Sequence, residues 1–80
     1  MRTINDGVIR NFIEISEMYS NDFTVVEIIN IDYSIGEETG RILGLCNNFE
    51  EAWDKSSSFD TLHTTVITGL NKMSTLGGFV

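Results

Sequence analysis

Nucleophilic chemistry in this chain would depend on Cys46, the only thiol among its 80 residues, with His63, the only imidazole, as the base. A cysteine becomes a nucleophile where its pKa is lowered and a base lies close by. The apolar alternation around Cys46 instead predicts that it faces inward from a strand, where an uncharged thiol packs as a small hydrophobic group. We therefore interpret Cys46 as a core residue and expect no catalytic dyad.

A metal site could begin with Asp60 and His63, which are three positions apart and would share one face of a helix. Two ligands do not make a site without a third from another segment, and Asp60 is more simply explained as a helix cap. The sequence has no Asp-x-Asp-x-Asp-Gly calcium loop and no glycine-rich phosphate loop. We expect neither a metal nor a cofactor.

Glu27 is the one carboxylate whose position suits acid–base chemistry, because it alternates onto the same strand face as Val25 and Ile29. Burial there would raise its pKa. A charged residue on an apolar strand face more commonly protects a sheet edge or pairs with an arginine, here Arg10 or Arg41. We favour the structural role for Glu27, and we expect no enzyme activity.

The strongest charge feature is an acidic stretch. The chain has 12 Asp and Glu against five Lys and Arg, a net charge of −7, and no Lys or Arg lies between Asn11 and Gly40. Such a stretch attracts basic surfaces, and the chain lacks the cationic face needed to bind nucleic acid or an anionic membrane directly. The alternative is a solvated face that only keeps the protein soluble. The acidic residues of the stretch are Glu14, Glu17, Asp22, Glu27, Asp32, Glu37 and Glu38.

The first element that would position these residues is an amphipathic helix of about four turns. Asn5 or Asp6 could cap its start, and the polar residues 20–22 would end it. Its apolar face would consist of Val8, Ile9, Phe12, Ile13, Ile15, Met18 and Tyr19.

Residues 23–35 and 41–46 are rich in β-branched and apolar side chains and predict a β-hairpin. We expect a loop over residues 37–40 that closes with Gly40 at positive φ and so pairs Gly36 with Arg41. The face of the hairpin that forms the core would carry Val25, Ile29, Ile31, Tyr33, Ile35, Ile42 and Cys46. The opposite face would carry a smaller apolar patch, Val26, Ile28, Leu43 and Leu45, which the C-terminal segment or another subunit would cover.

Asn48 and Glu51 form a capping box, which predicts a second helix that ends near Ser56–Ser58. This helix should bury Phe49, Ala52 and Trp53. Residues 59–73 are ambiguous, because the spacing of their apolar residues favours a helix whereas the β-branched run 64–68 favours a strand. We expect a helix there, ended by Gly77 and Gly78.

These elements predict one α+β domain over residues 1–80, in the order helix, strand, strand, helix, helix, with the hairpin packed on the helices. The exposed edges and the apolar patch suggest a homodimer or a higher homo-oligomer. The single cysteine and the lack of an apolar run for a signal peptide or membrane span favour the cytoplasm.

The favoured function is that of a non-catalytic acidic inhibitor, which covers a nucleic-acid-binding or nucleotide-binding surface of a basic protein partner. Small acidic proteins of phage and other mobile elements act in this way against host defence. The partner-binding residues would be Glu14, Glu17, Asp22, Glu37 and Glu38, together with the patch Val26, Ile28, Leu43 and Leu45.

The alternative is an oligomeric protein that binds or sequesters a small ligand such as a nucleotide. Its pocket between subunits would be lined by Thr64, Thr65, Thr68, Gly77 and Gly78.

Overall fold

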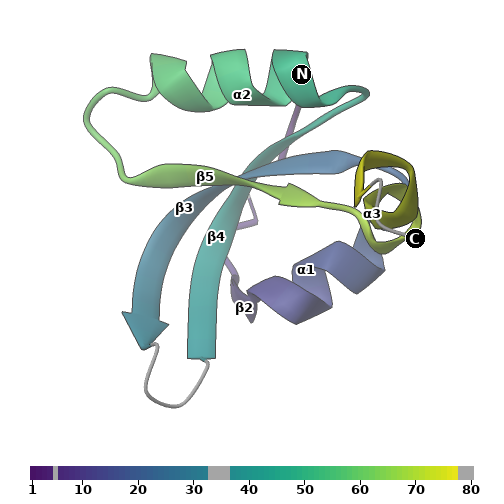
Figure 1. Cartoon of the computed structure of the whole chain (residues 1–80). Coiled ribbons are helices and arrows are strands. Elements are labelled where there is room, and N and C mark those ends of the chain that lie inside the picture. Colours follow the sequence, from purple (N-terminus) through teal and green to yellow (C-terminus); the bar gives the residue numbers. More distant parts are fainter. Residues whose placement is uncertain (5, 33–36, 78–80) are drawn as a thin grey trace.

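A computed structural model describes residues 1–4, 6–32 and 37–77, with the backbone alone for residues 74–77. These residues form helices and one antiparallel sheet, which confirms the α+β class (Figure 1). The strands are β1 (Arg2–Thr3), β2 (Ile9–Asn11), β3 (Phe23–Asp32), β4 (Glu37–Cys46) and β5 (Thr64–Thr68). The helices are α1 (Phe12–Met18), α2 (Phe49–Ser58) and α3 (Leu70–Gly77). None of these helices is both long and apolar enough to cross a bilayer.

The sheet is built around the long antiparallel pair of β3 and β4. Its strand order is β1-β4-β3-β5, and β2 also pairs with β4. Helix α2 packs on one face and α1 on the other, above and below β5 in Figure 1. The core under α2 contains Phe23, Val25, Cys46 and Ala52, and the core under α1 contains Ile15, Val26 and Ile42.

The first helix is shorter than expected, because residues 9–11 form a strand beside β4 and the helix begins only at Phe12. The prediction that Asp6 caps the first helix is therefore wrong. Asn5, the other predicted cap, lies outside the described residues. The Asp6 side chain accepts a hydrogen bond from the Val8 N–H (3.0 Å), and Gly7 between them adopts φ 70°, so the chain turns here. The cap is Asn11, whose Oδ1 accepts from the Ile13 N–H at 2.8 Å.

The hairpin strands are confirmed, but the expected loop and register are wrong. Residues 37–40 belong to β4, where Gly40 pairs with Ile28. A Cβ on Gly40 would lie 2.7 Å from the Glu27 carbonyl oxygen and 2.9 Å from the Phe12 ring, so this glycine allows close packing and does not close a turn. Tyr33, Ile35 and Gly36 of the expected pairing lie outside the described residues.

The two faces of the hairpin also differ from the expected alternation. The pairing shifts between Val25 and Val26 and again between Ile28 and Asn30. The extra residue is Leu43 of β4 at the first shift and Ile29 of β3 at the second, and each one disturbs the alternation of its own strand. Ile29 is consequently exposed instead of buried. Val26 packs under α1 together with Ile67 of the C-terminal half, so this part of the patch is covered within the chain, as one of the two expected alternatives stated.

The second helix begins as predicted, with Asn48 Oδ1 accepting from the Glu51 N–H at 2.8 Å. Ala52 is buried, but the expected burial of Phe49 and Trp53 is wrong, since they are 42% and 57% exposed. Their rings stack with centroids 6.1 Å apart. The Glu51 carboxylate binds the Met1 amino group at 2.9 Å, and this hydrogen bond lowers the pKa of Glu51.

The expected helix over residues 59–73 is wrong. Residues 64–68 pair with β3 as strand β5, and the helix begins at Leu70. The β-branched side chains here are half-buried between the two helix layers, with Val66 against the α2 core and Ile67 against the α1 core. Strand propensity and pairing with β3 together outweigh the helical spacing of the apolar residues.

Candidate partner-binding groove

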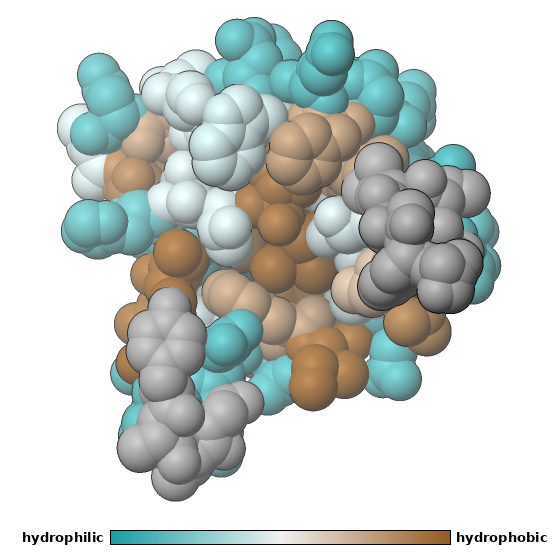
Figure 2. All heavy atoms as spheres, viewed as in Figure 1, coloured by the Kyte–Doolittle hydropathy of each residue, from teal (hydrophilic) through white to brown (hydrophobic). Residues whose placement is uncertain are grey.

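An open groove of about 570 Å³ lies where α1, β5 and α3 meet. Apolar surface gathers at the centre and lower part of this side of the molecule, with hydrophilic side chains around it (Figure 2). The exposed apolar side chains of the groove are Ile13 of α1 and Leu70 and Met73 of α3. The remaining lining residues are Phe12, Ser16, Glu17, Glu38, Val66, Ile67 and Thr68.

Helix α1 is held against the sheet in an orientation that exposes Ile13 to the groove. Ile15 is fully buried under the helix, whereas Ile13 is 68% exposed. The Ser16 hydroxyl donates to the Thr68 carbonyl at 3.0 Å, which ties α1 to the end of β5. The wall formed by α1 is therefore held by the buried Ile15, by Phe12 and Tyr19 packed against the same core, and by the Ser16 hydrogen bond.

The opposite wall is positioned by the turn that follows α1. The Gly69 N–H donates to the Asp22 carbonyl (2.9 Å), and the Asn71 N–H donates to the Ser20 carbonyl (2.8 Å). The Asn71 side-chain amide also donates to Asn21 Oδ1 at 3.0 Å. These bonds fix the start of α3 beside the end of α1, although about 50 residues separate the two segments.

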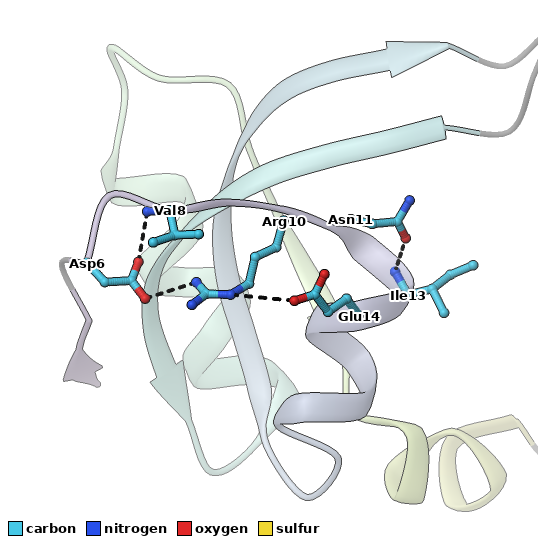
Figure 3. A network of polar contacts seen from close by, with 6 residues as sticks. All are labelled: Asp6, Val8, Arg10, Asn11, Ile13 and Glu14. Carbon is cyan, nitrogen blue, oxygen red and sulfur yellow. Dashed lines mark hydrogen bonds and ion pairs between the residues drawn. The ribbon is translucent and has the colours of Figure 1, made fainter.

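The acidic stretch is partly neutralised by arginines, contrary to what the sequence order suggested. Figure 3 shows Arg10 between Asp6 and Glu14, at 2.9 and 3.9 Å. The Val8 N–H and then Arg10 hold the pKa of Asp6 below its ordinary value. Arg2 pairs with Asp22 at 2.9 Å, and Arg41 Nε lies 3.8 Å from Glu27 Oε1, which matches the structural role predicted for Glu27.

Glu17, Glu37 and Glu38 have no cationic partner among the described residues. Glu17 of α1 and Glu38 of β4 both line the groove, which combines apolar walls with two uncompensated carboxylates. Such a surface is complementary to an apolar segment that carries Lys or Arg.

The partner-binding residues predicted from the sequence do not form one surface. Val26 and Leu45 are buried in the core, where no partner can reach them, and Ile28 and Leu43 are half-buried. The groove residues Ile13, Leu70 and Met73 were not among the predicted site residues, because their apolar spacing indicates helix faces that pack inward. Nothing in the local pattern distinguishes them from core residues.

One hydroxyl of the alternative small-ligand site, that of Thr64, is engaged within the fold. Thr64 Oγ1 lies 2.7 Å from Ser56 Oγ and donates to the Ser56 carbonyl at 2.9 Å. Thr68 lines the groove, and Thr65 lies between them on β5. Gly77 is the last residue of α3, and Gly78 lies outside the described residues.

Comparison with known proteins gives no match to a family model, a curated protein or a solved structure. Over residues 1–4, 6–32 and 37–77, no group of three or more His, Cys, Asp or Glu side chains is placed to hold a metal ion. His63 is exposed, and its carbonyl accepts from the Ile28 N–H at 2.8 Å.

Cys46 should be unreactive in the folded protein. Its side chain is buried, and burial, with a smaller effect from the negative charge of Glu51, raises the pKa of its thiol. Alkylation by iodoacetamide at pH 8 should be at least about tenfold slower than in the urea-unfolded chain, because reaction requires opening of the core. A rate equal to that of the unfolded chain would show that this core is not closed.

Proposed function

We infer that the chain is a non-catalytic binding protein whose groove receives an apolar segment with basic residues from another protein. The observation that carries this proposal is the position of Glu17 and Glu38 beside the exposed apolar side chains of Ile13, Leu70 and Met73. Apolar contact would supply the lasting part of the affinity, and the carboxylates would select a cationic partner.

The net charge of −7 supports the same proposal at longer range, because it attracts a cationic protein before contact. Surfaces that bind nucleic acid or nucleotides are basic. Docking of such a surface in the groove would block its access to phosphate, which makes the protein an inhibitor of a nucleic-acid- or nucleotide-handling partner. Phage and other mobile elements are one setting for such an inhibitor. A phosphate ligand of the groove itself is disfavoured, because Glu17 and Glu38 would repel it.

The charge requirement can be tested with a capped lysine–valine heptapeptide of sequence Lys-Thr-Val-Thr-Lys-Thr-Val, in which lysine and valine share one face of an extended strand. The double variant Glu17→Gln/Glu38→Gln should bind it about 3- to 30-fold more weakly than the unmodified protein, since each exposed ion pair contributes up to about 1 kcal/mol. The measurement is fluorescence anisotropy with a labelled peptide. The difference should shrink in 0.5 M salt, because salt screens exposed charges.

The matched control is Glu50→Gln/Asp54→Asn on α2, which changes the net charge equally on the opposite face of the sheet. Its affinity should stay within about twofold, because charges farther away than the Debye length are screened. Equal weakening by both double variants would show that only the net charge matters for binding, and it would exclude the groove as the binding site. Equal binding of a glutamate–valine heptapeptide would contradict the proposed function.

A further inference from the structure

Strand β5 has one edge without a partner strand in the part of the chain that the structure describes, because it is the last strand in the order β1-β4-β3-β5. The bonds from the Ile28 N–H to the His63 carbonyl and from the Gly69 N–H to the Asp22 carbonyl set the phase of its pairing with β3. In an antiparallel pair, alternate residues bond to the partner strand. Residues 63, 65, 67 and 69 therefore face β3, and the N–H and C=O groups of Thr64, Val66 and Thr68 face outward.

This edge lacks the features that commonly protect an exposed strand. Residues 64–68 include no charged residue and no proline, and their pairing with β3 shows no bulge. The Thr68 carbonyl is occupied by the Ser16 hydroxyl, but the outward N–H and C=O of Val66 and the N–H of Thr68 have no such partner among the described residues.

The open edge and the groove form one continuous surface, because Val66, Ile67 and Thr68 belong to both. A strand laid along β5 would direct alternate side chains to the α1 side of the sheet. There they would meet Ile13, Leu70 and Met73, with Glu17 and Glu38 beside them.

We propose that the partner's basic segment binds in an extended conformation, as an additional strand hydrogen-bonded to the outer edge of β5. Its apolar side chains enter the groove and its lysine or arginine side chains pair with Glu17 and Glu38. This mode rests on the proposed function and specifies the conformation of the partner. Main-chain hydrogen bonds supply affinity in such complexes, while the pockets for alternate side chains supply specificity.

The charge of the surface favours a basic partner over a second copy of this chain. Pairing of two β5 edges would bring together two molecules of net charge −7, each with uncompensated glutamates beside the contact. Like charges at an interface oppose association. A cationic segment removes this repulsion and satisfies the same backbone groups.

Amide hydrogen exchange measured by NMR tests the binding mode. In the free protein the Val66 amide should exchange faster than the Thr65 and Ile67 amides, which bond to β3. With the lysine–valine heptapeptide at about 100 times its Kd, exchange at Val66 should slow by up to about 100-fold, because only the free fraction exposes that N–H.

A variant pair supports the same test. Proline is compatible with an edge strand where its nitrogen faces away from the sheet, so Val66→Pro removes the outward donor and leaves the pairing with β3. Val66→Ala is the control for the lost side chain. Val66→Pro should bind the peptide at least about tenfold more weakly than Val66→Ala, with both variants folded by circular dichroism.

The outcomes separate the two proposals. Peptide binding without slower exchange at Val66 would overturn strand addition and leave the proposed function in place. Absence of binding to the unmodified protein would overturn both. The Val66 amide could instead be protected without peptide, with protection that rises with protein concentration as a dimer forms in sedimentation velocity. That result would assign the edge to a second copy and overturn the basic-partner assignment.

Discussion

Gly69→Ala should be among the most destabilising single-methyl changes in this chain. A Cβ at residue 69 would meet the backbone carbonyl oxygens of Tyr19 and Ser20 closer than real Cβ atoms approach other atoms. The Ser20 carbonyl cannot easily retreat, because it accepts the Asn71 N–H at 2.8 Å. We expect a loss of about 3 kcal/mol or more, the upper end of the effect of overpacking, which lowers the Tm by roughly 4–8 °C per kcal/mol in a domain of this size. Thermal unfolding followed by circular dichroism measures it.

Gly7→Ala is the matched control. A Cβ at Gly7 would have open space around it, and only its φ of 70° disfavours alanine. That substitution should cost about 1–2 kcal/mol from backbone strain. If Gly69→Ala were no more destabilising than Gly7→Ala, the close packing between the turn after α1 and the start of α3 would be contradicted. The position of the groove wall that depends on this packing would be contradicted as well.

Ile15→Ala should lower the free energy of unfolding by about 2–5 kcal/mol, because it removes buried atoms and leaves a cavity between α1 and the sheet. The Ile15 side chain is fully buried against Val26 and Ile42. Domains of this size have a total stability of roughly 0.05–0.15 kcal/mol per residue, so this loss is a large part of the whole. Urea denaturation measures the change.

Ile13→Ala provides the comparison on the same helix, two residues away. Ile13 is mostly exposed, so its truncation should change the unfolding free energy by no more than about 0.5 kcal/mol. It should nevertheless weaken binding of the lysine–valine peptide, since Ile13 lines the groove. Equal destabilisation by the two variants would contradict the orientation of α1.

Short-range interactions explain which elements could be predicted from the sequence. Asn48 and Glu51 are three residues apart and begin α2 through a hydrogen bond between them, so the cap can be predicted from the local sequence. The β-branched composition of residues 23–32 predicts β3, and the alternation around Cys46 predicts its burial. These features depend on residues close together in the chain.

The acidic surface shows why charge along the sequence is an incomplete guide to charge in space. Arg2 pairs with Asp22, which lies 20 residues later in the chain. Arg10 lies in strand β2 and not in the expected helix, yet it still pairs with Glu14. Arg2 and Arg10 lie outside the stretch that contains no Lys or Arg. Only folding shows that Glu17 and Glu38 remain uncompensated while Glu14 and Asp22 do not.

The sequence by itself determined the α+β class, the hairpin strands, the start of α2 and the burial of Cys46, because composition and hydrogen bonds within a few residues dictate them. The tertiary structure alone decided the strand at residues 64–68, the bulged register of β3 with β4, and the groove between α1, β5 and α3. Each of these depends on pairing between distant segments, where contact free energy outweighs local preference. The exposure of Ile13 and the burial of Ile15 in one short helix illustrate that division.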